Sequence, residues 1–203
     1  MRTDAYKSIR GPAAAEMKVR GSRFIGEAIP VRDEEEAALR IDEVKRREHA
    51  ATHHCTAYRL GPEGDVFRYN DDGEPGGTAG PPILRQIESR DLTDILVVVT
   101  RYFGGTQLGT GGLARAYGEA AEQALEAADV VTHVIFTRLY VSFQYDDTSP
   151  AMYTIEQYGG QVVASTYSEK TELTLDVPSS RVDAFEEAFV DALGGRGEIG
   201  RGV

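Results

Sequence analysis

The first part of the chain alternates between two hydrophobic periods, one typical of strands and one typical of helices. Residues 17–20 and 22–29 carry short apolar runs separated by Gly21, which predicts two strands joined by a tight turn. Residues 34–50 place apolar side chains three and four positions apart, which predicts a helix. Asp33 fits the N-cap of this helix, and its early glutamates and late basic residues complement the helix dipole.

The middle of the chain contains the most apolar run. Residues 95–99 are continuously apolar and mostly β-branched, which is typical of a strand buried on both faces. Five glycines follow within nine positions, and residues 113–128 then show helical spacing of apolar side chains. Further strands are predicted at residues 52–60 and 66–69, and a short helix at residues 83–90. The central unit is therefore a strand, a glycine loop and a helix.

The pattern changes after Asp129 and predicts a second domain. Strands are expected at residues 134–145, 161–167, 171–177 and 198–203, and helices at residues 146–160 and 179–193. This β-α-β-β-α-β order is that of the ferredoxin-like fold. We therefore predict an α+β protein of two domains, with the first over residues 1–131 and the ferredoxin-like domain over residues 132–203.

Composition and charge change the expected partners. The 203 residues carry 22 Lys and Arg against 33 Asp and Glu, a formal net charge of −11. The lysines are few (Lys7, Lys18, Lys45 and Lys170), and abundant acid with scarce lysine resembles the surface of a halophile protein. This balance lowers the expectation of a nucleic-acid partner, although concentrated salt would screen it. No apolar run of transmembrane length and no signal peptide is visible, so we expect a cytoplasmic protein.

The glycine loop after the buried strand is the first candidate site. Glycine amides can approach a ligand closely, and the helix N-terminus that follows favours a negative charge, so the loop could bind an anion. The alternative is a structural loop whose glycines serve tight turns and close packing. The spacing matches neither a dinucleotide fingerprint nor a P-loop. We expect a phosphate or nucleic-acid site made of Arg101, Gly104, Gly105, Gly109, Thr110, Gly111, Gly112 and Arg115. In this hypothesis the helix begins near Leu113, Thr110 caps it, Gly111 has a positive φ angle, and Arg115 reaches the anion.

A second glycine-rich loop is predicted to lie beside the first. Its candidate site residues are Asp71, Asp72, Glu74, Gly76, Gly77 and Thr78. The carboxylates could hold Mg²⁺ or Ca²⁺, but they lack the EF-hand spacing, and a solvated acidic turn is the favoured interpretation. Arg101 and Arg115 could equally bind phosphate or pair with these acids. We expect no metal and no cofactor.

His53, His54 and Cys55 are adjacent on a predicted strand. A Cys near a His can be a nucleophile and its base, yet side chains two apart on one strand run parallel. A lone cysteine is usually a small buried hydrophobe, and this is the favoured interpretation for Cys55. No catalytic residue is assigned, and the protein is expected not to be an enzyme.

Three stretches together resemble the IMPACT family: Asp71–Gly80, Val97–Gly105 and Leu108–Tyr117. Weaker matches at residues 21–25 and 51–58 occur in the order that the family requires. The resemblance implies a first domain similar to domain 2 of ribosomal protein S5 and to the fourth domain of elongation factor G. It implies a second domain similar to the last domain of that factor.

The resemblance also carries functional expectations. For prokaryotic members the fold implies association with nucleic acid or the ribosome, with no established reaction. Eukaryotic members restrain a translation-control kinase through an extra N-terminal domain, for which this chain leaves no room before Lys18. We therefore expect a non-enzymatic, translation-associated factor that binds RNA or a ribosome-linked partner. The alternatives are an enzyme or sensor of a small phosphorylated ligand at the glycine loops, and an adaptor that uses the second sheet.

Overall fold

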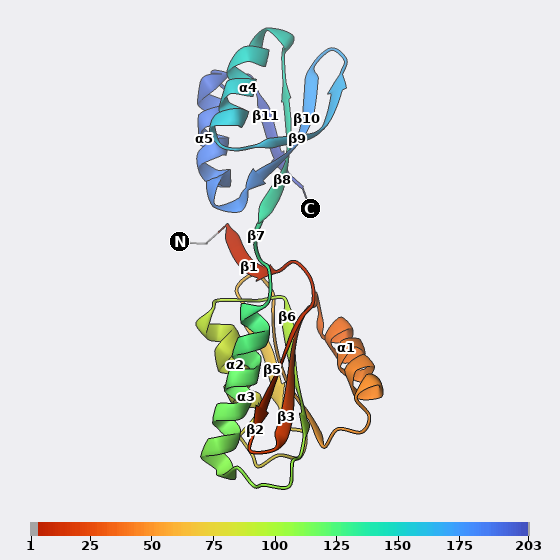
Figure 1. Ribbon diagram of the computed structural model, residues 1–203. Coiled ribbons are helices and arrows are strands. Elements are labelled where there is room, and N and C mark those ends of the chain that lie inside the picture. Colours follow the sequence, from red (N-terminus) through yellow and green to blue (C-terminus); the bar gives the residue numbers. More distant parts are fainter. Residues whose placement is uncertain (1–3, 203) are drawn as a thin grey trace. The chain divides into compact units, whose positions relative to one another are not determined.

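The computed structural model describes residues 4–202, which form two compact units. The first unit is Tyr6–His133, and the second is residues 134–202 with residues 4 and 5. Apart from Ala5 and Val134, the first contains β1 (Ala5–Ile9), β2 (Ala13–Val19), β3 (Ser22–Pro30), α1 (Glu34–Arg47), β4 (His53–Leu60), β5 (Val66–Asn70), α2 (Gly80–Ser89), β6 (Ile95–Tyr102), α3 (Gly109–Glu126) and β7 (Val130–Val134) (Figure 1). The mixed α+β class is as predicted.

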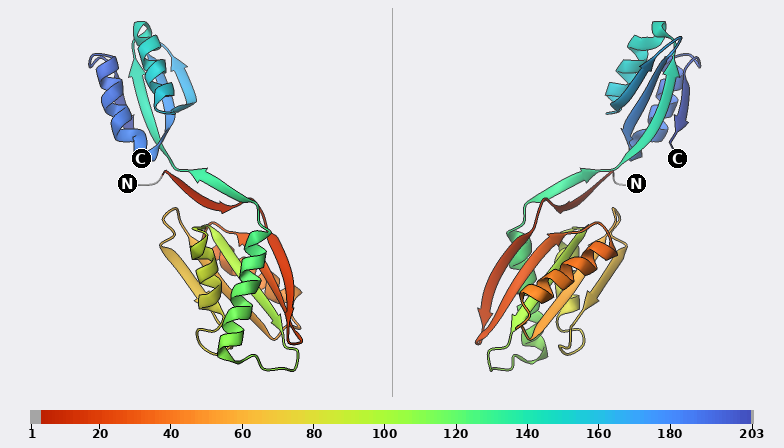
Figure 2. Two further views of the ribbon diagram at one scale, coloured as in Figure 1. Left: turned by 60° about the vertical axis from the view of Figure 1, so that its left-hand side comes forward. Right: turned by 90° about the vertical axis from the view of Figure 1, so that its right-hand side faces the viewer.

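The first unit is built around β6, the central strand of a five-stranded antiparallel sheet. The strand order is β2-β3-β6-β4-β5. The side chains of Ile95, Val97 and Val99 pack into the core beneath α2 and α3, whereas Leu96 and Val98 pack into the core beneath α1. Figure 2 shows α2 and α3 on one face of the sheet and α1 on the other. The continuous apolar run is therefore a strand covered on both faces.

The second unit is a ferredoxin-like sheet with helices on one face. Its elements are β8 (Phe136–Phe143), a 3₁₀ turn (Tyr145–Asp147), α4 (Thr148–Gln157), β9 (Gln161–Tyr167), β10 (Thr171–Pro178), a second 3₁₀ turn (Ser179–Arg181), α5 (Val182–Ala192) and β11 (Glu198–Arg201). The strand order is β11-β8-β10-β9, with every neighbouring pair antiparallel. Alternate residues of β8 and β10, such as Leu139 and Leu175, are buried against Phe185 and Phe189 of α5. No described helix of this unit lies on the opposite face of the sheet (Figure 2).

Three local features differ from the sequence-based expectation. Strands β1 and β7 were not predicted; they form a separate two-stranded sheet in which Tyr6 stacks on His133. Helix α3 begins at Gly109, four residues before the predicted start at Leu113. The strand predicted over residues 134–145 ends at Phe143, and Tyr145 is 80% exposed in a 3₁₀ turn. No helix of the described chain is long and apolar enough to cross a membrane.

Gly26 of β3 provides a test of the packing between the sheet and α3. A Cβ atom at this position would lie 2.2 Å from the backbone oxygen of Ala120 in α3. We expect Gly26→Ala to lower the free energy of unfolding by about 1–3 kcal/mol, because the helix must move outward. Urea unfolding gives the measurement. The control is Gly11→Ala, where a Cβ atom meets nothing within 4 Å; equal midpoints for the two variants would contradict the close approach.

Candidate functional site at the glycine-loop end

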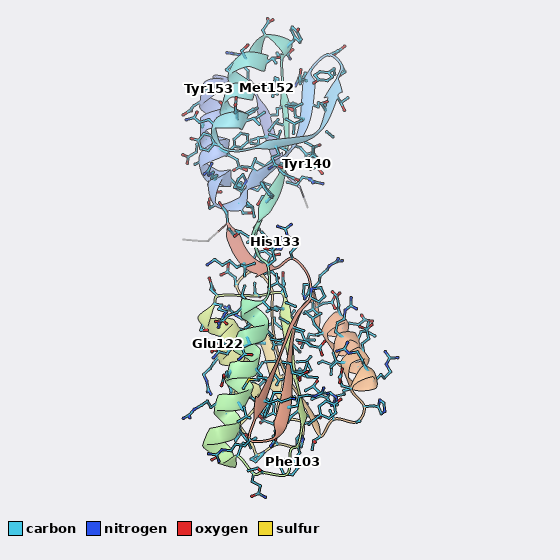
Figure 3. All side chains as sticks on the ribbon, in the orientation of Figure 1. Phe103, Glu122, His133, Tyr140, Met152 and Tyr153 are labelled. Carbon is cyan, nitrogen blue, oxygen red and sulfur yellow. The ribbon has the colours of Figure 1, made fainter. Side chains whose placement is uncertain are left out.

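Both glycine loops lie at one end of the five-stranded sheet. Arg101 pairs with His53, and Tyr102 pairs with Arg23, so the β2–β3 turn, the α1–β4 connection and the loop after β6 meet there. The loop after β5 also reaches this end through Glu74, which contacts Arg101. We call this region the glycine-loop end and define it as residues 16–24, 44–54, 71–79 and 100–112. Figure 3 shows Phe103 at this end.

Gly104 brings the loop after β6 into contact with the β2–β3 turn. A Cβ atom on Gly104 would lie 1.9 Å from the carbonyl carbon of Gly21, so no larger residue fits without moving the backbone. The amide of Gly104 donates to the Ser22 hydroxyl at 3.1 Å. Gly21 itself has a φ angle of +86°, which glycine adopts without strain. These two glycines therefore serve close backbone packing.

The centre of the glycine-loop end is a buried polar cluster around Glu74. The guanidinium of Arg101 donates to Glu74 Oε1 at 2.5 Å, and the side chains of both residues are almost fully buried. The Tyr117 hydroxyl, on α3, donates to the same oxygen at 2.7 Å. Burial raises the pKa of Tyr117, and the neighbouring Cys55 and Glu74 act in the same direction, so the phenol stays protonated. One carboxylate thus joins the second glycine loop to β6 and α3.

Arg101 is enclosed by aromatic rings as well as by Glu74. Its guanidinium carbon lies 5.5 Å from the ring centroid of Phe24 and 5.5 Å from that of Phe103. Its Nε atom is buried and has no hydrogen-bond partner among the described residues. Of the two alternatives for this arginine, the structure shows pairing with an acid.

Asp71 organises the second glycine loop instead of lying in solvent. Its carboxylate accepts hydrogen bonds from the amides of Gly77, Ala79 and Gly80, at 2.8–2.9 Å, just where α2 begins. Burial raises the pKa of Asp71, but these three backbone donors outweigh that effect and hold the pKa below its usual value. The favoured interpretation of a solvated acidic turn is therefore wrong for Asp71 and Glu74. Within the described residues, no cluster of His, Cys, Asp and Glu side chains suits a metal ion.

Cys55 and His53 lie beside the cluster but do not form a nucleophile–base pair. The Cys55 thiol is fully buried and donates to the backbone oxygen of Asp71 at 3.1 Å. Burial raises the pKa of Cys55 to about 12, so the thiolate is scarce at neutral pH. His53 instead places Nδ1 2.7 Å from the Asp72 backbone oxygen and Nε2 3.8 Å from Glu74 Oε1.

The residues predicted to bind an anion are not arranged as expected. Thr110 lies inside α3 and does not cap it; Leu108 is the N-cap residue and makes no side-chain capping bond. The positive φ angle belongs to Gly109 and Gly105 rather than to Gly111. Arg115 is exposed and lines a shallow depression beside Arg85 of α2. Gly76 and Gly77 are exposed, whereas Thr78 is buried and donates to the Pro75 backbone oxygen.

Tyr117 and Ser22 are contributors to the cluster that the sequence did not single out. Ser22 lies within hydrogen-bond distance of both Arg101, at 3.4 Å, and Gly104. Tyr117 follows Leu113 by four residues on a helix stripe that is otherwise mostly alanine. A large polar aromatic residue among these small ones was the only sequence feature that could have pointed to its role. Both residues lie within stretches that resemble the IMPACT family, but the resemblance gave neither of them a role.

The local charge of the glycine-loop end differs from that of the chain. Its four segments contain seven Lys and Arg against five Asp and Glu, a formal charge of +2, whereas the whole chain carries −11. Lys18, Arg20 and Arg46 are exposed there and form no ion pair with another described residue. This end is therefore the surface of the first unit best suited to an anionic partner.

Fold and site define a two-domain α+β protein with a five-stranded sheet covered by helices in the first unit, a ferredoxin-like second unit and a buried polar cluster between two glycine loops. The model of the Impact N-terminal domain matches residues 20–125. A second model, described as Domain of unknown function (DUF1949), matches residues 141–196. The chain belongs to the IMPACT family.

Relatives of the chain support this assignment over nearly its whole length. It is 34% identical over 198 residues to IMPACT family member YvyE of Bacillus subtilis, covering 98% of this chain and 91% of that one. It is also 34% identical to IMPACT family member YigZ of Escherichia coli, covering 89% of each. A crystal structure described as that of a hypothetical protein is 29% identical, with a TM-score of 0.67 and coverage of 98% and 97%.

The buried ion pair gives a stability prediction. Glu74→Ala should lower the free energy of unfolding by about 3–5 kcal/mol, because it leaves Arg101 charged and buried. Glu74→Leu combined with Arg101→Met should cost less, since no charge is then buried. Urea unfolding measures both variants, with the exposed Glu88→Ala as a control expected to be nearly neutral. An unchanged free energy of unfolding for Glu74→Ala would contradict the prediction and show that this carboxylate is solvated.

The environment of Cys55 predicts a protected thiol. At pH 8 the native protein should react with iodoacetamide at least about a hundredfold more slowly than the urea-unfolded chain, because the thiol is buried and its pKa is raised. Mass spectrometry over time gives both rates. Rapid labelling of the native protein would reopen the nucleophile hypothesis.

Proposed function

We propose that this protein is a non-enzymatic, translation-associated factor that binds RNA, or a ribosome-linked RNA surface, through the glycine-loop end. The observation that carries the proposal is the +2 charge of this end in a chain of −11. Phosphate backbones attract such a surface, while the acidic remainder of the chain repels them. The domain folds, similar to those of ribosomal protein S5 and elongation factor G, support a role in translation.

Two further features of the glycine-loop end support an RNA partner. Phe103 is 49% exposed although it is aromatic, and an exposed ring offers a stacking platform for an unpaired base. Gly105, Gly109 and Gly111 have open space where a Cβ atom would lie, so their backbone can approach a phosphate closely. Because Glu74 already neutralises Arg101, the binding cations in this proposal are the exposed ones at the rim.

The second candidate function is binding of a small phosphorylated ligand at the same loops. The buried Nε of Arg101, which lacks a partner among the described residues, is the observation that favours it. Such a ligand would have to displace Phe103 from the guanidinium. We rank this function below RNA binding for that reason.

The test is a titration of labelled tRNA and of purified ribosomes with the full chain. Lys18→Gln with Arg20→Gln should weaken tRNA binding about tenfold and reduce the salt slope by about 2, because each cation contacts one phosphate. Arg32→Gln with Arg68→Gln makes the same charge change away from this end and should have little effect. Phe103→Ala should also weaken binding, by roughly fivefold or more.

Three outcomes would overturn the proposal. They are no binding of tRNA or ribosomes by the wild type, equal losses in the two double variants, and a salt slope that the first variant leaves unchanged. A nucleotide panel in the same assay reports on the second candidate. Saturable binding of a nucleotide without RNA binding would favour it.

A further inference from the structure

The face of the second sheet that lies opposite α4 and α5 has an ordered arrangement of side chains. Glu198, Ser142 and Glu172 face each other across β11, β8 and β10 and form an acidic row. The next row places Tyr140 between Gly200 and Thr174. In a third row Arg138 and Asp176 form a two-bonded ion pair at 2.8 Å. We call the first two rows, with their β9 neighbours, the acidic face.

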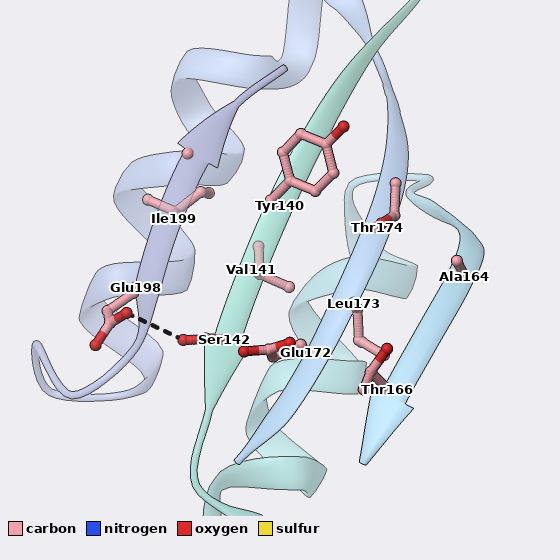
Figure 4. Close-up of a pocket in the computed structure, with 11 residues that line it drawn as sticks. Tyr140, Val141, Ser142, Ala164, Thr166, Glu172, Leu173, Thr174, Glu198 and Ile199 are labelled. Carbon is pink, nitrogen blue, oxygen red and sulfur yellow. Dashed lines mark hydrogen bonds between the residues drawn. The ribbon is translucent and has the colours of Figure 1, made fainter. Parts of the chain in front are cut away.

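The acidic face is hollowed because small residues flank Tyr140. Gly200 lacks a side chain, and Ala164 of β9 lies beside Thr174. The resulting depression has a volume of about 400 Å³. Figure 4 shows the carboxylates of Glu198 and Glu172 on either side of Ser142, with Tyr140 further along the same strand. Tyr140, which lines the depression, is 52% exposed, so one face of its ring is accessible to a partner.

Charge determines which partner suits this face. Residues 134–202 contain five Lys and Arg against eleven Asp and Glu, a formal charge of −6. Four of the five cations already pair with carboxylates of this unit: Arg138, Lys170, Arg196 and Arg201. Glu172 has no ion pair with a described residue, although it lies in the hollow. The unit therefore presents uncompensated negative charge next to an exposed aromatic ring.

The face already binds one ammonium group of its own chain. Lys170, from the β9–β10 turn, places Nζ 2.7 Å from Glu198 Oε1. This contact, together with a hydrogen bond from Ser142, holds the pKa of Glu198 below its usual value, so Glu198 is ionised at neutral pH. An ammonium or guanidinium group is thus the chemistry that these carboxylates accept.

We propose that the acidic face is a docking site for a lysine- and arginine-rich segment of a partner protein. One cationic head group would lie over Ser142, between Glu172 and Glu198. These two residues are on strands that flank β8, so their backbones are about 10 Å apart and both carboxylates can reach a central cation. The aliphatic stem would run along the Tyr140 ring, and a neighbouring cation of the segment would contact its face.

The same charge argues against other occupants of the face. RNA would place phosphates against Glu172 and Glu198, and like charges repel. A second copy of this chain carries the same net charge of −11, and in its densest basic run, residues 45–47, Lys45 and Arg47 already pair with Asp72 and Glu27. A basic protein segment can satisfy both features, because its cations pair with the carboxylates of Glu172 and Glu198 and its side chains pack on the Tyr140 ring. The proposal is independent of RNA binding at the glycine-loop end.

The test uses the full chain and a labelled ten-residue peptide of alternating Arg, Lys and Gly, with its Gln-substituted copy as the neutral probe. We expect saturable binding of the basic peptide alone, measured by fluorescence anisotropy at low salt. Glu172→Gln and Tyr140→Ser should each weaken binding roughly three- to fivefold, because each removes one exposed contact. Lys170→Ala should strengthen it by a similar factor, since Glu198 becomes free.

Matched controls separate docking from general attraction to an acidic protein. Glu156→Gln and Tyr153→Ser alter the same residue types at exposed positions on α4 and should change the affinity less than twofold. The proposal is overturned if the basic peptide does not bind, or if Glu156→Gln weakens it as much as Glu172→Gln. It is also overturned if Tyr140→Ser abolishes tRNA binding while leaving peptide binding intact.

Discussion

The first unit depends on the burial of one ion pair, Glu74 with Arg101. Two charges removed from water cost more than their attraction returns unless hydrogen bonds satisfy them, and here the Tyr117 hydroxyl supplies one. The pair joins a loop, the central strand and a helix that are far apart in sequence. The pair fixes the position of the second glycine loop against β6 and α3. If that loop moved, Arg101 would remain buried without its counter-charge.

This constraint explains why two acidic side chains of the second glycine loop, Asp71 and Glu74, turn inward. Asp71 is directed inward by three backbone amides, and Glu74 by Arg101, so the loop bends back on itself. Gly104 must be small because it touches Gly21. What remains at the surface includes backbone, Phe103, polar side chains such as Thr106 and Gln107, and the exposed cations. Such a surface suits binding of a broad partner better than chemistry on a small enclosed substrate.

Elements with a clear periodic pattern of apolar residues could be predicted from the sequence. Elements that form only through tertiary contacts could not. The strand at residues 95–99 was predictable because burial on both faces requires a continuous apolar run. The β-α-β-β-α-β order was predictable because strands buried on one face alternate apolar and polar residues. Strands β1 and β7 are short and depend on each other for pairing, so neither shows a pattern alone. The start of α3 at Gly109 was hidden because glycine is a poor helix former. The inward direction of Asp71 follows from amides eight and nine residues away, which spacing does not reveal.

Net charge is a poor guide to the partners of this protein, because its charges are unevenly distributed. The glycine-loop end carries +2, while residues 134–202 carry −6, and screening limits each field to about 8 Å at physiological ionic strength. A bound partner therefore experiences the local surface and not the sum of −11. Ribosome-like assemblies present both phosphate backbones and basic protein segments. The two binding reactions proposed above use surfaces of opposite charge, so each should weaken independently as salt rises.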